Sequence, residues 1–172
     1  MTPEFSRTER IDTIGGDARA VSIEATPGER AAIARRFDLV ALDRLAAELS
    51  VRRTASGVMV EGRVTAAATQ ACAITGDPLP VSIDEAVALR FVDAQASEED
   101  IELDADGLDT VEIEDGAVDL GELAAETLAL ALDPFPRGPN AEAALRAAGV
   151  LREEDVRPAN AFSGLKDKLS GR

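Results

Sequence analysis

Two neighbouring stretches of the chain alternate between apolar and polar residues, and this pattern limits the fold more than any other feature. Nearly every second residue is apolar in both stretches, which cover residues 45–52 and 58–65. A period of two places these apolar side chains on one face of a β-strand. The connection between the stretches, Thr-Ala-Ser-Gly at residues 54–57, is short and contains a glycine. The sequence therefore predicts a β-hairpin with one buried face.

Two further stretches predict strands that join this hairpin. Residues 19–25 alternate around Val21 and Ile23, and residues 81–91 carry apolar side chains at most odd positions. The Thr-Gly-Asp-Pro sequence at residues 75–78 predicts the turn before the later strand. Glu85 interrupts the apolar face of that strand, which indicates a β-bulge or an edge position. The expected sheet is an antiparallel meander of three strands, joined by the early strand.

Helix-start signals mark two main helices. Thr26 is placed to cap a helix with Pro27 in its first turn, and Glu29 completes a capping box. Asp119 and Glu122 have the same spacing, with Asp119 in the cap role. The residues after Asp119 carry apolar side chains at helical spacing, and this helix ends at the Asp-Pro pair of residues 133–134.

These elements predict an α+β fold, with an antiparallel, partly barrel-like β-sheet, two main helices and an irregular, proline-containing C-terminal tail. A length of 172 residues suits one domain. We assign residues 1–136 to it, with a mobile acidic loop at about residues 93–110. Residues 137–172 form a C-terminal extension with short helices, the first over residues 140–149 with Asn140 as its N-cap. Phe162, Leu165 and Leu169 share one helical face in this extension, which either docks on the domain or contacts a partner.

Charge is distributed very unevenly along the chain. The 33 acidic and 18 basic residues give a net charge of −15. Between Arg90 and Arg137 there are 15 carboxylates and no Lys or Arg, so the rest of the chain is neutral. We call residues 91–136 the acidic interval. Its densest part predicts a partner-binding segment, made up of Glu98, Glu99, Asp100, Glu102, Asp104 and Asp106.

This charge pattern favours one class of partner over others. A nucleic-acid binder needs Lys and Arg to replace counterions on phosphates, so direct binding to bare RNA is disfavoured, as is an anionic membrane surface. An acidic segment raises the encounter rate with a basic protein. The alternative is that the run is a solvated loop that keeps the protein soluble. The charged N-terminus has no signal-like region and no apolar run nears membrane-spanning length, so we expect a cytoplasmic protein.

The residue inventory does not predict an enzyme. The chain has no His, one Cys and neither a phosphate-binding GxxxxGK[ST] loop nor a GxSxG motif. Cys72 stands on an apolar, alanine-rich stretch with no cation nearby, which is typical of a buried small hydrophobe. We therefore expect no cofactor, no metal and no small-molecule substrate. Two alternatives remain: a hydrolase that uses a pair of carboxylates, and a thiol-redox protein that uses Cys72.

Four segments resemble, in order, motifs of the YceD family of large ribosomal RNA subunit accumulation proteins. They cover residues 29–37, 70–78, 118–136 and 160–165, which read ERAAIARRF, QACAITGDP, VDLGELAAETLALALDPFP and NAFSGL. Most of the chain lies within or between these segments. The family-motif residues that we assign on this basis are Cys72, Thr75, Pro78, Asp119, Glu122, Pro134, Pro136 and Asn160.

The resemblance implies a role in the synthesis, processing or stability of large-subunit (23S) ribosomal RNA, and it implies no catalytic residue. Many members have a Cys where Thr75 stands and further Cys near the proline segment, which would permit a metal. This chain lacks them, so metal binding is not carried over. Together with the charge pattern, the resemblance predicts a non-enzymatic factor that binds a basic ribosomal protein or an assembly factor.

Overall fold

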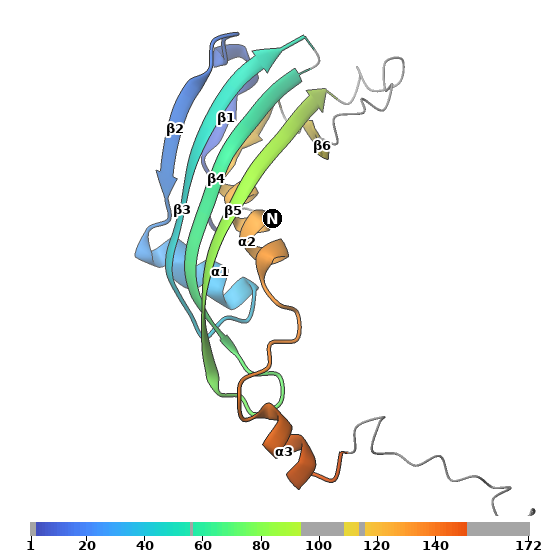
Figure 1. The fold of residues 1–172 in the computed structure, drawn as a ribbon. Coiled ribbons are helices and arrows are strands. Elements are labelled where there is room, and N and C mark those ends of the chain that lie inside the picture. Colours follow the sequence, from blue (N-terminus) through green and yellow to red (C-terminus); the bar gives the residue numbers. More distant parts are fainter. Residues whose placement is uncertain (1–2, 56, 94–108, 114–115, 151–172) are drawn as a thin grey trace, which may run out of the picture.

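The computed structural model describes residues 3–55, 57–93, 109–113 and 116–150. A five-stranded sheet forms most of the molecule, in the order β2, β3, β4, β5 and β6 (Figure 1). Its first four strands are antiparallel neighbours, and β6 pairs in parallel with the end of β5. The bounds are β2 (Arg19–Glu24), β3 (Ala41–Thr54), β4 (Gly57–Ala71), β5 (Pro78–Asp93) and β6 (Asp109–Ile113).

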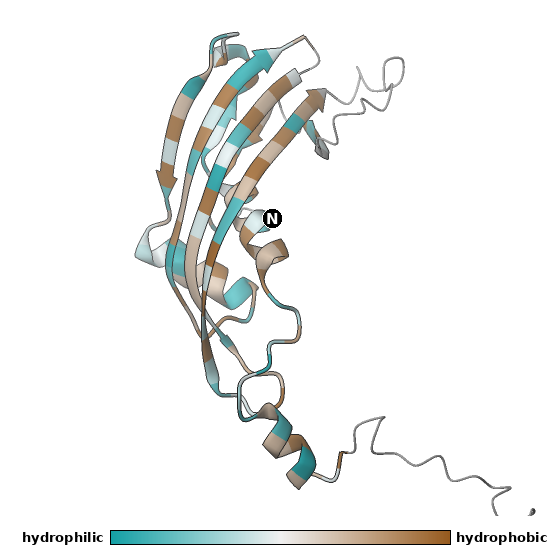
Figure 2. Cartoon of the chain, in the orientation of Figure 1, coloured by the Kyte–Doolittle hydropathy of each residue, from teal (hydrophilic) through white to brown (hydrophobic). Residues whose placement is uncertain are grey.

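The predicted hairpin is confirmed as the centre of this sheet. β3 and β4 pair from their connection, where Thr54 faces Gly57, to the pair of Ala41 and Thr69. Alternating bands of hydropathy follow the strands (Figure 2). The apolar positions of both predicted stretches are buried, which gives the hairpin the expected core face: Leu45, Ala47, Leu49, Val51, Val58, Val60 and Val64.

The sheet curves around one helix but does not close into a barrel, as the partly barrel-like prediction expected (Figure 1). Helix α2 (Leu120–Ala131) lies on the inner side of the curve and contacts β3, β4 and β5. Its predicted apolar face is buried through Leu120, Leu123 and Leu128. Helix α1 (Pro27–Arg36) connects β2 to β3. No helix in the described part of the chain is long and apolar enough to cross a membrane.

Both main helices begin where the sequence predicts. The Thr26 hydroxyl accepts a hydrogen bond from the Glu29 backbone N–H at 3.4 Å, and the Glu29 carboxylate accepts from the Thr26 N–H at 2.7 Å. This is the capping box. At α2 the Asp119 carboxylate accepts from the backbone N–H groups of Gly121 and Glu122. Glu122 does not complete a box there, because its carboxylate pairs with Arg36 instead.

Three details of the strand and cap predictions are corrected or sharpened. The register between β4 and β5 runs without a shift past Glu85, so the predicted bulge is wrong. The edge position is confirmed, because β6 pairs only with the last five residues of β5 within the described chain. Asn140 occupies the predicted N-cap position, but its side chain does not cap the helix. Its side chain makes no cap hydrogen bond to α3 (Ala141–Ala147) and instead donates to Asp77.

The N-terminal segment fastens the two main helices together. Strand β1 (Thr8–Arg10) pairs with β7 (Ala117–Asp119), directly before α2. Phe5 is fully buried in the core. Arg7 forms an ion pair with Glu29 of α1 at 2.8 Å. Arg36 of α1 reaches Glu122 of α2 at 2.7 Å, and it also contacts Glu4. The sequence predicted none of these contacts.

Replacing Gly121 by alanine tests how closely the N-terminal segment approaches α2. A Cβ atom at Gly121 would lie 2.5 Å from the backbone oxygen of Phe5, whereas one at Gly28 would meet nothing within 4 Å. Both glycines are the second residue of their helices. We expect Gly121→Ala to lower the free energy of unfolding by about 2 kcal/mol, because backbone must move. Gly28→Ala should leave it unchanged or raise it by up to about 1 kcal/mol. Urea titrations of both variants decide this, and equal stabilities would contradict it.

Ionisation of Glu29 should make the free energy of unfolding depend on pH in the acid range. The hydrogen bond from Arg7 holds the pKa of the Glu29 carboxyl at about 2, below its ordinary value of 4.5. A lowered pKa stabilises the fold above pH 4.5, and the contribution disappears as pH falls from there to about 2. Glu29→Gln should therefore cost about 1 kcal/mol at neutral pH and nothing near pH 2. Glu48→Gln, on an exposed strand position, is the control. A constant difference between wild type and Glu29→Gln across this range would contradict the assignment.

Candidate partner-binding surface

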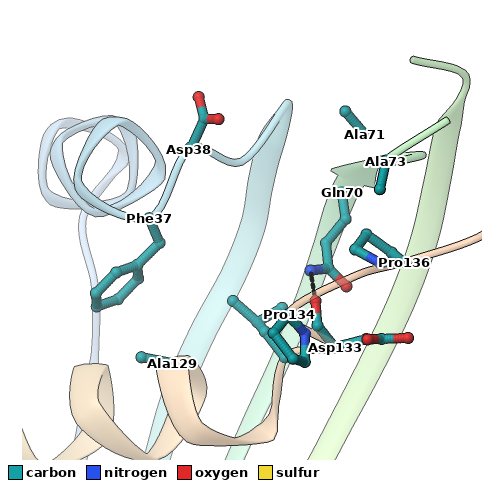
Figure 3. Close-up of a pocket in the computed structure, with 10 residues that line it drawn as sticks. Phe37, Asp38, Gln70, Ala71, Ala73, Ala129, Asp133, Pro134 and Pro136 are labelled. Atoms are coloured by element: carbon teal, nitrogen blue, oxygen red, sulfur yellow. Dashed lines mark hydrogen bonds between the residues drawn. The ribbon is translucent and has the colours of Figure 1, made fainter. Parts of the chain in front are cut away.

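The structure brings two of the family-like segments together at one end of the sheet. The first is the end of β4 with the turn that follows, and the second is the proline-rich chain after α2. The Ala73 N–H donates to the Pro136 carbonyl at 2.8 Å, and the Gln70 side-chain amide donates to the Asp133 carbonyl at 2.8 Å (Figure 3). We call this contact region, residues 70–78 with 132–141, the motif junction.

A tight turn at residues 72–77 forms one side of the motif junction. The Cys72 N–H donates to the Asp77 carbonyl, and the Gly76 N–H donates to the Cys72 carbonyl, both at 2.8 Å. Gly76 has a φ of 74°, a left-handed conformation that glycine adopts without strain. The Thr75 hydroxyl accepts from the Asp77 N–H at 3.3 Å. Thr75 therefore supports the turn through its hydroxyl.

Cys72 is enclosed where the two segments meet. Its side chain belongs to the buried core at 3 % exposure, which confirms the prediction of a buried thiol. Its sulfur accepts a hydrogen bond from the Gly138 N–H at 3.3 Å. This bond, followed by bonds from Thr75 and Ile74, lowers the pKa of the Cys72 thiol to about 7. The sequence suggested no local cause for such a shift. The donors are hydrogen-bonding groups rather than cations, and the largest contribution comes from the distant Gly138.

An open recess lies beside the motif junction, between the end of α1, the end of β4 and the chain after α2 (Figure 3). It has a volume of about 390 Å³. Phe37 points toward Ala129 at its apolar side, and Gln70 and Asp133 form its polar side (Figure 3). Phe135 projects into solvent next to it at 73 % exposure. The described residues that line it include no Ser, Cys, Lys or His, and its two carboxylates, Asp38 and Asp133, come from separate elements.

The predicted family-motif residues have structural roles where the structure describes them. Cys72, Thr75 and Pro78 form the turn and the start of β5, and Pro134 and Pro136 line the recess. The remaining two, Asp119 and Glu122, anchor the start of α2, as described above. Outside the described residues lie Asn160 and all the predicted partner-binding residues, which are Glu98, Glu99, Asp100, Glu102, Asp104, Asp106, Phe162, Leu165 and Leu169.

Two parts of the site were missed by sequence reasoning. One is the bond from Gly138 to Cys72, which joins residues 66 positions apart. The other is the pair of Gln70 and Asp133, which are 63 positions apart. A glycine between Pro136 and Pro139 was the only available signal. A Cβ atom at Gly138 would lie 2.9 Å from a methyl carbon of Leu79, so a larger residue there would displace the end of the Leu79 side chain. In the part of the chain that the structure describes, no group of three or more His, Cys, Asp or Glu could hold a metal.

Cys72 reports whether the motif junction is closed. Alkylation by iodoacetamide requires the buried thiol to become exposed, so labelling of the native protein should be at least about tenfold slower than labelling in urea. Gln70→Ala removes the bond to Asp133 and should accelerate native labelling. Ser82→Ala, an exposed change on β5, should not. Equal labelling rates for native and urea-unfolded protein would show that the junction does not enclose Cys72.

Comparison with known proteins bears on the same region. No curated protein and no solved structure matches the chain. A protein-family model matches residues 60–167, which is more than half of the chain. The match begins within β4 and contains the turn, α2 and the proline-rich chain that together build the motif junction. The chain therefore belongs to the YceD family, whose description is large ribosomal RNA subunit accumulation protein.

Proposed function

We propose that this protein supports accumulation of large-subunit ribosomal RNA as a non-enzymatic factor that binds a basic ribosomal protein or an assembly factor. Family membership supports the role in large-subunit ribosomal RNA. The acidic interval carries the proposal for the partner, because it concentrates 15 carboxylates without one compensating Lys or Arg. The negative charge of this interval attracts a basic protein and repels the phosphates of RNA.

The arginines of the described chain also support a protein partner over bare RNA. Arg7, Arg19, Arg36 and Arg63 all form ion pairs with carboxylates, at 2.6 to 2.8 Å for their shortest contacts. A guanidinium that already pairs with a carboxylate contributes less to counterion release on a phosphate backbone. These four arginines therefore do not form a continuous basic surface of the kind that RNA-binding domains use.

Neither alternative enzyme is favoured by the site. A thiol-redox protein needs an accessible thiolate, whereas Cys72 is enclosed by the Gly138 backbone. A carboxylate-pair hydrolase needs two carboxyl groups that converge on a substrate cleft. The recess at the motif junction carries Asp38 and Asp133 on separate elements, beside apolar side chains that give a sugar no aromatic platform beyond Phe37.

The proposal is tested by pull-down of purified large-subunit ribosomal proteins with a variant that neutralises the predicted segment. The six changes are Glu98→Gln, Glu99→Gln, Asp100→Asn, Glu102→Gln, Asp104→Asn and Asp106→Asn. At about 50 mM salt the wild type should retain a basic ribosomal protein and release most of it near 0.5 M, because salt screens exposed charges. The variant should bind at least about tenfold more weakly with an unchanged unfolding midpoint.

The control carries the same change in net charge at scattered exposed positions. It combines Asp12→Asn, Asp17→Asn, Glu24→Gln, Asp43→Asn, Glu48→Gln and Glu61→Gln. We expect the control to lose less than about threefold in binding, because its changes lie outside the acidic interval. Equal losses of binding in both variants would indicate that the acidic interval serves only to keep the protein soluble. Tight binding of the wild type to bare 23S RNA, with no protein present, would overturn the protein-partner mechanism.

A further inference from the structure

A second, larger hollow lies between α2 and β5. It is a groove of about 460 Å³ whose walls are mostly apolar. Val87 and Leu89 come from β5, and Leu123 and Leu130 come from α2. Leu130 is 88 % exposed, although it follows the buried Leu128 by only two residues. The other lining residues are Glu85, Ala86, Ala88, Val111, Glu126, Thr127 and Ala131.

One wall of this groove is an open sheet edge. β6 pairs with β5 from Leu89 to Asp93 and with no earlier residue. Within the described chain, residues 78–88 of β5 therefore have a strand neighbour on only one side, which is β4. An unpaired edge offers a row of backbone donors and acceptors to another strand. Pro78 and Pro80 block its first part, which leaves residues 81–88, alongside the groove, able to pair.

The groove is also negatively charged. Two carboxylates, Glu85 and Glu126, line it, and no Lys or Arg does so among its described residues. Glu85 stands on the face of β5 that carries Ile83 and Val87 toward α2. Partial desolvation, and then the charge of Glu122, raise the pKa of the Glu126 carboxyl.

We propose that this groove binds an extended basic segment of the partner protein, which adds a strand to the open edge of β5. Apolar side chains of that segment pack against the accessible Leu89, Val111 and Leu130, and its Lys or Arg side chains lie beside Glu85 and Glu126. This rests on the proposed function, and it specifies where and how the partner docks. The binding mode combines main-chain pairing at a sheet edge with side-chain recognition in the adjacent groove.

The surroundings of the groove favour a basic partner over other occupants. The chain leaves β5 at Asp93 and re-enters the sheet at Asp109, beside Leu89, so the stretch that holds the six predicted partner-binding carboxylates begins and ends at the same edge. A second copy of the chain would instead bring another net charge of −15. The C-terminal extension leaves through α3, which lies beyond the β4–β5 turn at the far end of the sheet (Figure 1). Its apolar residues also follow helical spacing rather than the alternation of a strand.

A defined peptide tests this docking mode directly. The probe is a fluorescent, acetylated and amidated heptapeptide that alternates lysine and valine, and binding to the full chain is followed by anisotropy at about 50 mM salt. The double variant Glu85→Gln/Glu126→Gln should weaken binding at least about tenfold. The matched double variant Glu48→Gln/Glu61→Gln, at exposed positions of β3 and β4, has the same net charge and should change it less than about twofold.

Two further measurements separate strand addition from simple attraction of charge. A probe with N-methyl groups on alternate amides keeps its charge and side chains but loses its strand donors, so it should bind at least about tenfold more weakly. Leu130→Ser should also weaken binding, because it removes the exposed apolar wall. Equal losses in the two glutamine double variants, or full binding of the N-methylated probe, would overturn the proposal. Stronger probe binding after deletion of residues 151–172 would also overturn it, because the chain's own extension would then be the occupant. A dimer in analytical ultracentrifugation that the probe dissociates would overturn it as well, because a second copy would then be the occupant.

The ribosomal-protein pull-down distinguishes failure of the groove from failure of the proposed function. If Glu85→Gln/Glu126→Gln retains the basic ribosomal protein as well as the wild type does, the groove is not the docking site and the proposed function stands. If the groove variants abolish probe binding but the wild type captures no ribosomal protein, the groove is a strand-binding site and the proposed function fails.

Discussion

The carboxylate of Asp119 joins the N-terminal segment to the start of α2. It accepts hydrogen bonds from the N–H groups of Gly121 and Glu122 at the start of α2, from the Arg7 N–H at 2.8 Å, and from the Ser6 hydroxyl. A single charged group therefore starts α2 and attaches the N-terminal segment. Because α2 fills the inner side of the sheet, the position of that helix fixes both hollows that we describe.

Much of the fold was predictable because its signals are local. The alternation around Leu49 and Val60 is contained within two short stretches, and so is the capping box of Thr26 and Glu29. These patterns depend on periodicity and on backbone groups a few residues away. The prediction at Glu85 was half right, because an acidic residue on an apolar face marks an edge and a bulge equally well.

The motif junction was not predictable in the same way. Its contacts join Gln70 to Asp133 and Cys72 to Gly138, across more than 60 residues, and no periodicity links such positions. The pair of Arg36 and Glu122 spans 86 residues and reads in the sequence as two ordinary surface charges. The parallel pairing of β6 was missed for a related reason, because it depends on where the acidic interval returns to the sheet.

Strand β5 runs from the motif junction to the groove beside α2. It begins at the motif junction with Pro78, carries Glu85 along its open edge, and ends at Asp93, where the densest acidic stretch begins. In the proposed docking mode, a partner attracted by the acidic interval would therefore find the groove on the same strand. The segments that border the recess, at the opposite end of β5, are joined by hydrogen bonds within the chain. Their arrangement therefore depends less on charge than binding at the groove does.

The pairing of β1 with β7 has a consequence for how the chain folds during synthesis. Residues 19–93 contain the four antiparallel strands and α1, and all the antiparallel pairings among these strands lie within that span. The segment from Phe5 to Arg10 is made first, yet it pairs with residues 117–121, which are made more than 100 residues later. The meander therefore emerges from the ribosome with its apolar inner face uncovered, and α2 and the waiting N-terminal segment close it only after residues 117–131 have been made.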